Sequence, residues 1–485
     1  MSGSIRYVDR DTTPMYREAD AGTRRLVHEL LWGDRVEVLD EGAARSHVRA
    51  RGLEGWVDPR ALGDTPLLEI YFIDVGQGDG VLVRCPDDRH VLVDGGFNRA
   101  KQPSGKNAAD FVDWKFVRDY RRREIVLDAM ISSHCDADHY GGLWDLLNPD
   151  AHHELDARRV QVGAFYHAGV SWWDDGGRRN LGPSERGHLV RLLDDEASVA
   201  SALRPGASPM LQGEWADFLR CVRDARCAVR RLSHRHEYLP AFERNDVATG
   251  RVAFRVLGPV EPEPGRLLDL GSDSRNTNGN SIILRLDYGR VRVLLTGDLN
   301  RASQRRLLEA YTGRRMEFAC DVAKACHHGS ADVSYEFLST MSPAATVISS
   351  GDSESHAHPR PSIVAASALA GHVRLEKDAV VTPLVYSTEI SRSVRMGRIT
   401  HIEAAGVGLA DDRLDGHATA DVHFAEVGAG DLRAKRGRRR LAGSYVVAGM
   451  IYGLVNVRTN GERILCATLN EKKRTWDCQG FRSRF

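Results

Sequence analysis

The sequence predicts a layered α/β protein, with a small β module before it and a β-rich extension after it. Strand-like apolar runs alternate with helix-like stretches through the middle of the 485-residue chain. Short alternating segments, separated by turn residues, precede this region and return after it. Because a chain of this length exceeds one ordinary core, two or three domains are expected. We place them at residues 1–65, 66–376 and 377–485.

The composition is that of a globular protein, with 42% apolar and 28% charged residues. Basic and acidic residues balance at 67 each, so binding to a nucleic acid would require a local patch and not a net field. No export signal and no apolar run of bilayer-spanning length is recognisable, and eight scattered cysteines do not form a disulfide framework. We expect a cytoplasmic protein without membrane insertion.

Residues 1–65 have the pattern of a small all-β module. Apolar and polar residues alternate in 35–39 and 46–50, with Gly- and Asp-containing turns between the segments. The segment closes with Gly55-Trp56-Val57, which resembles the end of a bacterial Src-homology-3-like domain. That resemblance implies a small β-barrel that docks a peptide or another domain, and a packing appendage is the alternative.

The central region contains the predicted α/β elements. Strands are expected at residues 67–73, 80–84, 90–94, 125–132, 281–286 and 291–296, and a helix is expected at 299–310. Residues 151–251 form an insertion, either a substrate-shaping lid or a solvated helical decoration.

The carboxy-terminal region from residue 377 consists of short β-like pieces and polar loops. Its basic run, residues 433–440, would either grip a polyanion or form a mobile charged loop. The hairpin signal Thr459-Asn460-Gly461 predicts two paired strands around it. We therefore expect a β extension, whose role the sequence leaves open.

A cluster of four candidate metal ligands follows the apolar strand that ends near residue 132. Alternate side chains of an extended segment share a face, so the first three can converge with the fourth beside them. Imidazole and carboxylate groups hold borderline and hard divalent cations. A solvated turn is the alternative. The four residues are His134, Asp136, Asp138 and His139.

This cluster resembles the His-x-His-x-Asp-His signature of the metallo-β-lactamase superfamily, with Asp136 in place of the second histidine. The resulting His-x-Asp-x-Asp-His pattern resembles the hydrolase domain of the ComEC competence family. Further stretches resemble that family in the same order, namely residues 72–79, 91–96, 280–284, 294–298, 324–330 and 358–361. The resemblance implies an αββα sandwich and metal-dependent hydrolysis, without the family's transport part.

Two ions a few ångströms apart need a shared anionic ligand, and the carboxylate of Asp298 follows an apolar strand where it can serve. One site would combine Asp138, His139 and a later histidine, and the other would use His134 and Asp136. Asp94 would orient a ligand or the nucleophile. We expect one or two divalent ions, Zn²⁺ or Mn²⁺, or else Mg²⁺.

The later histidines complete the expected site. His358 is predicted as a metal ligand or catalytic proton donor, and His328 as a catalytic group that contacts metal or phosphate. The adjacent His327 points elsewhere and either contacts substrate or is structural. Lys324 and Ser330 are expected to contact phosphate.

His167 is the candidate for the third histidine that the superfamily's first metal usually has, and a loop histidine near the pocket is the alternative. Without it, His134, Asp136 and Asp298 form an oxygen-rich site that suits Mn²⁺ or Mg²⁺ better than Zn²⁺.

The leading functional prediction is a phosphodiesterase or nuclease in which a metal-activated water attacks, with Asp94, Asp138, His328 and His358 as catalytic residues. A small-molecule ester, lactone or cyclic-nucleotide hydrolase is the second hypothesis, because a fold alone does not choose the substrate. A metal-stabilised interaction protein, which recruits a partner through its amino-terminal module, is the third.

Overall fold

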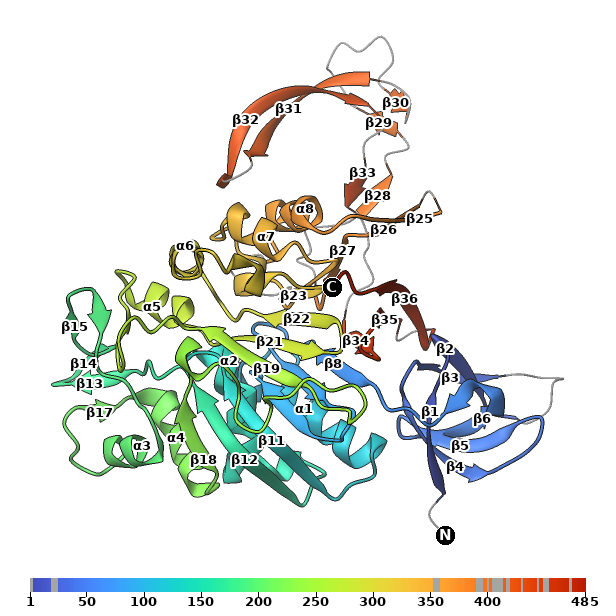
Figure 1. Cartoon of the computed structure of the whole chain (residues 1–485), viewed down its shortest axis with the longest axis horizontal. Coiled ribbons are helices and arrows are strands. Elements are labelled where there is room, and N and C mark those ends of the chain that lie inside the picture. Colours follow the sequence, from blue (N-terminus) through green and yellow to red (C-terminus); the bar gives the residue numbers. More distant parts are fainter. Residues whose placement is uncertain are drawn as a thin grey trace.

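The computed structural model describes residues 3–18, 25–351, 358–377, 379–389, 453–470 and 473–485, and the backbone of six strands between 396 and 447. The basic run at 433–440 falls in one of these strands, β32 (Asp431–Ala442), so its side chains lie outside the described residues. Among the described residues, no helix has both the length and the apolar character needed to cross a bilayer. Figure 1 shows the amino-terminal strands at one end of the molecule and the insertion at the other.

The amino-terminal module is a seven-stranded antiparallel sheet, in the order β3-β2-β6-β5-β4-β1-β7. The apolar residues of the predicted alternations point inward, as in β4, where Val36 and Val38 are buried. The strands are β1 (Ser4–Val8), β2 (Thr12–Tyr16), β3 (Leu26–Leu31), β4 (Arg35–Asp40), β5 (Ser46–Ala50), β6 (Leu53–Val57) and β7 (Leu62–Gly63).

The first large sheet has nine strands, in the order β18-β12-β11-β10-β9-β8-β34-β35-β36. The strands predicted at 67–73, 80–84, 90–94 and 125–132 are confirmed within a residue or two. The hairpin with the turn Asn460-Gly461 is also confirmed, but its first strand is Val455–Thr459 and not 444–457. The strands of this sheet are β8 (Leu68–Phe72), β9 (Val81–Arg84), β10 (His90–Val93), β11 (Glu124–Ser132), β12 (Arg159–His167), β18 (Ala228–Arg231), β34 (Val455–Thr459), β35 (Arg463–Asn470) and β36 (Thr475–Arg482).

The second large sheet has six strands, in the order β19-β21-β22-β23-β24-β27. They are β19 (Ala253–Gly258), β21 (Ile283–Tyr288), β22 (Val291–Leu295), β23 (Val322–Lys324), β24 (Ala345–Ile348) and β27 (Leu384–Ser387). The predicted helix is confirmed as α6 (Arg301–Ala310) and packs on this sheet with α7 (Tyr335–Met341) and α8 (Pro361–Ala370).

The two sheets pack face to face, so the protein has four layers, helix–sheet–sheet–helix. The inner faces share one apolar core, to which Phe72 and Ile131 contribute from the first sheet and Leu284 and Val347 from the second. The outer face of the first sheet is covered by α1 (Ala108–Asp113), α2 (Ala137–Leu147) and α4 (Gly213–Asp224). Burial of each large apolar side chain contributes about 1.5–3 kcal/mol, so the layered core dominates stability.

The insertion between the predicted motifs contributes to both the body and the surface of the protein. Its strands β12 and β18 extend the first sheet, and α4 packs on that sheet. A small sheet, formed by β13 (Trp173–Asp175), β14 (Arg178–Asn180) and β17 (Met210–Leu211), projects beyond it. The insertion is therefore partly core, and only its small sheets are surface additions.

The carboxy-terminal strands differ from the separate extension that the sequence suggested. Strand β34 pairs antiparallel with β8 along its length, with Val455 opposite Phe72 and Thr459 opposite Leu68. Without β34, the strand β8 would be an edge with unpaired backbone groups. The boundary expected at residues 376 and 377 therefore separates segments that share a sheet.

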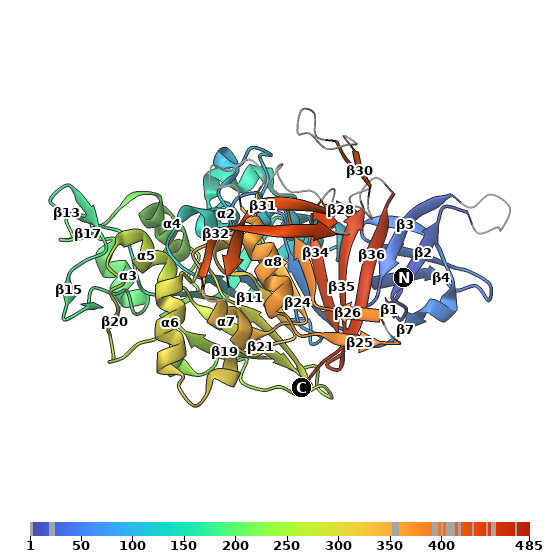
Figure 2. The ribbon, with the colours of Figure 1, turned by 90° about the horizontal axis from the view of Figure 1, so that it is seen from above.

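The amino-terminal module packs against these last strands (Figure 2). The indole of Trp476 on β36 donates a hydrogen bond to the Glu29 carbonyl of β3 at 2.8 Å, and Trp32 and Leu67 join the same apolar cluster. The module is thus anchored to the large sheet by contacts with a segment more than 400 residues away in sequence.

A buried ionic network lies under this junction. The fully buried guanidinium of Arg458 on β34 lies 3.0 Å from a carboxylate oxygen of Asp34 in the module and 3.1 Å from one of Glu69 on β8. Arg51 pairs with Asp34 at 3.3 Å, and Arg84 pairs with Glu69 at 2.6 Å. The network therefore joins the module, the first sheet and the carboxy-terminal strands through charges removed from water.

Candidate metal centre

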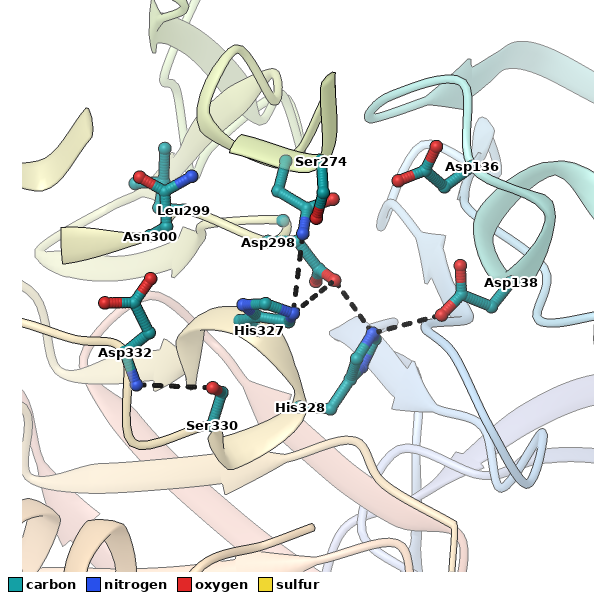
Figure 3. A network of polar contacts seen from close by, with 12 residues as sticks. Asp136, Asp138, Ser274, Asp298, Leu299, Asn300, His327, His328, Ser330 and Asp332 are labelled. Atoms are coloured by element: carbon teal, nitrogen blue, oxygen red, sulfur yellow. Dashed lines mark hydrogen bonds and ion pairs between the residues drawn. The ribbon is translucent and has the colours of Figure 1, made fainter. Parts of the chain in front are cut away.

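The predicted ligands meet where strands of both sheets end. Strands β10 and β11 run parallel, and Asp94 and the His134 loop follow their carboxyl ends. In the second sheet β22 and β23 are also parallel, so Asp298 and the turn at Cys326–Gly329 follow their carboxyl ends in the same way. The layered fold therefore brings the carboxyl edges of two sheets to one site (Figure 3).

Close backbone packing fixes the loop that carries the ligands. A Cβ added to Gly142 in α2 would lie 2.2 Å from the Gly95 carbonyl oxygen, and one on Gly141 would lie 2.1 Å from the Asn98 nitrogen. Only glycine allows the helix that begins at Ala137 to approach the turn after β10 so closely. Glycine is thus required at positions 141 and 142, where α2 packs against the turn that follows Asp94.

His139 is held by Asp94. Its Nδ1 lies 2.9 Å from one Asp94 carboxylate oxygen, and the other oxygen accepts a hydrogen bond from the Ser133 backbone N–H at 2.7 Å. A carboxylate at Nδ1 favours the tautomer that leaves Nε2 as an electron-pair donor. That Nε2 lies 3.3 Å from Asp298 Oδ2. Asp94 therefore has the geometry of a positioning residue for a metal-binding imidazole.

The turn after β23 brings His328 into the same space. His327 and His328 both have left-handed backbone angles, with φ of 49° and 51°, a conformation that costs a non-glycine residue about 1–2 kcal/mol. His328 Nε2 lies 2.9 Å from Asp298 Oδ2 and 3.6 Å from Asp138 Oδ2, as Figure 3 shows. The neighbouring His327 Nε2 lies 4.0 Å from Asp298. The strained turn thus presents one histidine fully to the site.

Within the part of the chain that the structure describes, candidate ligand atoms form four overlapping groups, and the atoms of each group lie within 4.8 Å of one another. Asp298 belongs to two of these groups, which fits the shared carboxylate that the sequence predicts. The groups are His134 with His139 and Asp298, Asp138 with His139 and His328, Asp79 with Asp298 and His328, and Asp79 with Asp94 and His139.

The donor atoms at the centre are buried, and among the described residues they have no hydrogen-bond partner outside the cluster, although Nε2 of His328 and of His139 lie 2.9 Å and 3.3 Å from Asp298 Oδ2. These atoms are Nε2 of His134, His139 and His328, and Oδ1 of Asp298. A buried polar atom without a partner costs about 1–3 kcal/mol, so such a set is retained where something else satisfies it. Imidazole nitrogens and carboxylate oxygens are ligands for divalent transition metals, and the residues present therefore fit a metal ion.

The electrostatics of the site also favour a cation. Burial disfavours a charged His139, but the carboxylates of Asp298, Asp94 and Asp138 outweigh burial and hold its pKa well above the ordinary value. Burial similarly opposes protonation of His328, whose pKa is nevertheless raised by Asp298 and Asp79. The imidazoles are thus embedded in excess negative charge, which a divalent cation would balance.

Lys324 lies in a different environment from the one expected of a phosphate contact. It is 2% exposed, its ammonium pairs with Asp79, and it donates a hydrogen bond to the Gly297 carbonyl at 3.0 Å. It also lies 3.5 Å from Asp298 Oδ1. Because these acceptors occupy its ammonium, Lys324 is a buried counter-ion of the site.

Other predicted residues lie beside the four ligand groups. Asp136 is outside them, 3.6 Å from His134 Nε2, and burial together with Asp138 raises its pKa to about 6. His358 is buried, with its ring 6.0 Å from that of His327, and Ser330 accepts a hydrogen bond from the Asp332 N–H. The roles of Asp136 and His358 at the metal, and of Ser330 at the phosphate, stay predictions.

His167 also lies outside the four groups. It ends β12 in register with Ser132 of β11, and its Nδ1 accepts a hydrogen bond from the Gly169 N–H at 3.1 Å. Its buried Nε2 has no hydrogen-bond partner among the described residues. Burial and the charge of Arg231 lower its pKa to about 3, so it stays neutral at physiological pH. Its role as a third ligand stays a prediction.

Asp79 and Thr277 were not predicted from the sequence, and the fold brings both to the site. Asp79 lies in the turn between β8 and β9, 3.2 Å from His328 Nδ1 and paired with Lys324. Thr277, in α5 (Asp273–Gly279), donates a hydrogen bond to Asp136 Oδ2 at 2.8 Å. Asp79 could have been suspected from the sequence, because an acid in a Gly-Gln-Gly-Asp-Gly turn follows a predicted strand. No local sequence pattern points to Thr277.

Comparison with known proteins gives one curated relative. The chain is 23% identical over 304 residues to ComE operon protein 3 of Bacillus subtilis (strain 168), which covers 61% of this chain. The chain spans only 30% of that relative's length. No family profile matches the chain.

Two solved structures also align with the chain. One is a diphosphatase from the PhnP family, with 14% identity, a TM-score of 0.25, and coverage of 56% of this chain and 72% of that one. The other is a mutant of CmlA beta-hydroxylase, with 12% identity, a TM-score of 0.27, and coverage of 59% and 46%.

Proposed function

We propose that this protein is a metal-dependent phosphodiesterase of the metallo-β-lactamase type, with a nucleic acid or another nucleotide diester as substrate. The observation that carries the proposal is the convergence of five ligand residues, whose central donor atoms are buried and directed at one another. These residues are His134, His139, His328, Asp138 and Asp298. The motif order, and the sequence similarity to ComE operon protein 3, support the same class.

The residues of this chain divide the work of such a reaction. Divalent ions bound here would lower the pKa of a water molecule and offset charge on the leaving oxygen. Asp298 lies between His139 and His328, and would be the ligand shared by two ions. Asp94 orients His139. His328 Nδ1 forms a hydrogen bond with the Ser349 carbonyl at 3.2 Å, and Asp79 lies at the same distance beside it. The half-buried carboxylate of Asp138 lies 3.6 Å from His328 Nε2 and accepts a hydrogen bond from the Gln77 amide at 3.1 Å, so it would hold an ion together with His139 and His328.

A small-molecule diester is the second candidate. A cavity of about 370 Å³ opens beside Asp136, within the size range of ligand pockets. The insertion forms part of its wall, through Trp172 and Arg179. A cavity of this size suits a discrete ligand, whereas a polymer requires that its ends leave the site.

Hydrolysis assays with defined metals test the proposal. Single- and double-stranded DNA, RNA and bis(p-nitrophenyl) phosphate would each be incubated with Mn²⁺, Mg²⁺ or Zn²⁺. We expect metal-dependent cleavage that is abolished in Asp138→Ala and Asp298→Ala, while circular dichroism shows that the fold is retained. Cleavage of the small ester alone would favour the second candidate. Retained activity in either variant would overturn the two-ion assignment.

A further inference from the structure

The cavity next to Asp136 is built differently from the ionic centre. Its floor is Cys135, Asp136 and Ala137, three consecutive residues of the ligand loop, so whatever occupies it is adjacent to the reacting groups. Its walls come mainly from the insertion, including the start of α4. Asp136 connects the cavity with the metal centre, because its Oδ2 lies 3.6 Å from His134 Nε2.

Aromatic side chains form much of the wall. Trp215 is buried and is fixed by an Nε1–H hydrogen bond to Ser171 Oγ at 3.1 Å, and its ring centroid lies 5.1 Å from that of Tyr140. Trp172 is half-buried, and the guanidinium of Arg179 lies 3.7 Å from its ring centroid. The fixed rings and the stacked guanidinium offer planar surfaces to a planar ligand.

The charged side chains that line the cavity are two cations, Arg179 and Lys101, and two carboxylates, Asp136 and Glu214. Arg179 has no carboxylate within ion-pair distance among the described side chains, although it belongs to a chain rich in such pairs. Lys101 also lines the cavity, paired with Glu214. The first turn of the twelve-residue helix α4 opens into the same space, and its N-cap Gln212 makes no side-chain hydrogen bond to that turn. The wall therefore adds hydrogen-bond donors and a free cation to the planar surfaces.

We propose that this cavity is the nucleobase subsite of the enzyme, in which a base lies against the Trp172–Arg179 pair while its phosphodiester lies at the metal centre. Aromatic rings and guanidinium planes are the surfaces on which unpaired bases stack. The donors of the wall suit the carbonyl oxygens and ring nitrogens of a base edge. This inference rests on the proposed phosphodiesterase function and names its substrate as a nucleotide diester.

A matched pair of substrates isolates the base. The p-nitrophenyl ester of thymidine 5′-monophosphate and its abasic analogue, the p-nitrophenyl ester of 1,2-dideoxyribose 5-phosphate, release the same leaving group, and only the first carries a base. We expect Trp172→Leu and Arg179→Met to lower kcat/KM for the thymidine ester by roughly ten-fold, in line with the free energy of stacking one base on an aromatic ring. The abasic ester should be nearly unaffected. Arg178→Met, a change of the exposed neighbour on the same strand, is the control and should change neither value.

An equal loss with both esters, or no loss with either, would overturn the base subsite. If the wild-type protein hydrolyses neither ester, binding of thymidine 5′-monophosphate and of deoxyribose 5-phosphate is measured by calorimetry. Tighter binding of the nucleotide, lost in Trp172→Leu, would keep the subsite and refute the hydrolytic function. Equal binding of the two ligands would refute the subsite independently of catalysis.

Discussion

Replacing Arg458 with methionine tests whether the module, the first sheet and the carboxy-terminal strands form one cooperative structure. The guanidinium is fully buried and contacts Asp34 at 3.0 Å and Glu69 at 3.1 Å. It also donates hydrogen bonds to the Tyr71 hydroxyl at 3.0 Å and the Asn456 Oδ1 at 3.3 Å. Methionine retains much of the side-chain length but none of these interactions.

The expected loss of stability follows from what remains after the substitution. Asp34 keeps Arg51 and Glu69 keeps Arg84, so each carboxylate loses one of its two cationic partners. Breaking a buried ion pair by removing one partner costs about 3–5 kcal/mol, because an uncompensated charge stays buried. Since both carboxylates here retain a partner, we expect the lower end, about 3 kcal/mol of the free energy of unfolding.

Urea unfolding followed by tryptophan fluorescence measures this change, because Trp32 and Trp476 lie at the junction itself. The control is Arg463→Met, which removes another ion pair between β35 and the module. Arg463 and Asp11 are 37% and 49% exposed, so their pair contributes at most about 1 kcal/mol. If Arg458→Met destabilises the protein no more than the control, the buried network does not join the three segments.

Three further outcomes are expected. Asp94→Asn should weaken metal binding by about 10–100-fold in a chelator competition while the fold persists, because the group that orients His139 is changed; unchanged affinity would contradict that role. Gly142→Ala should destabilise the protein in thermal unfolding, because its Cβ would meet the Gly95 carbonyl at 2.2 Å, and an unchanged midpoint would show that the loop can yield. Burial opposes ionisation of Asp34, but Arg51 and Arg458 outweigh it and keep its pKa below the ordinary value, so its contribution is present above about pH 4 and is lost as pH falls below that. Unfolding measured from pH 7 to pH 3 should show this decline in the wild type and a weaker one in Asp34→Asn.

Local sequence patterns predicted the parts of the fold that depend on local physics. Alternation marked strands such as β4, and the Asn460-Gly461 pair marked its hairpin, because both signals follow from backbone geometry within a few residues. The ligand loop was likewise visible, since four donors in six residues have few other uses. The structure brings three of them, His134, Asp138 and His139, into shared ligand groups.

Features that depend on distant pairing were not predictable in the same way. The pairing of β34 with β8 joins residues almost 400 positions apart, and no local pattern specifies a partner strand. The burial of Lys324 against Asp79 has the same origin, because a lysine in a polar motif resembles a ligand contact until its surroundings are known. The sequence therefore identified candidate ligand residues, but it did not show which charged side chains pair with one another.

The hairpin of β8 and β9 connects the structural network with the candidate metal centre. At its open end, Glu69 lies opposite Arg84 in register, within the ionic network that includes Arg458. At its closed end, the turn carries Asp79, which contacts His328 and Lys324. Strands of this length span roughly 15 Å, so the two charged clusters are separate but share one rigid support. The amino-terminal module and the carboxy-terminal strands thus hold the base of the hairpin whose tip positions a residue of the site, which gives these flanking segments a structural role in the proposed catalysis even without a partner protein.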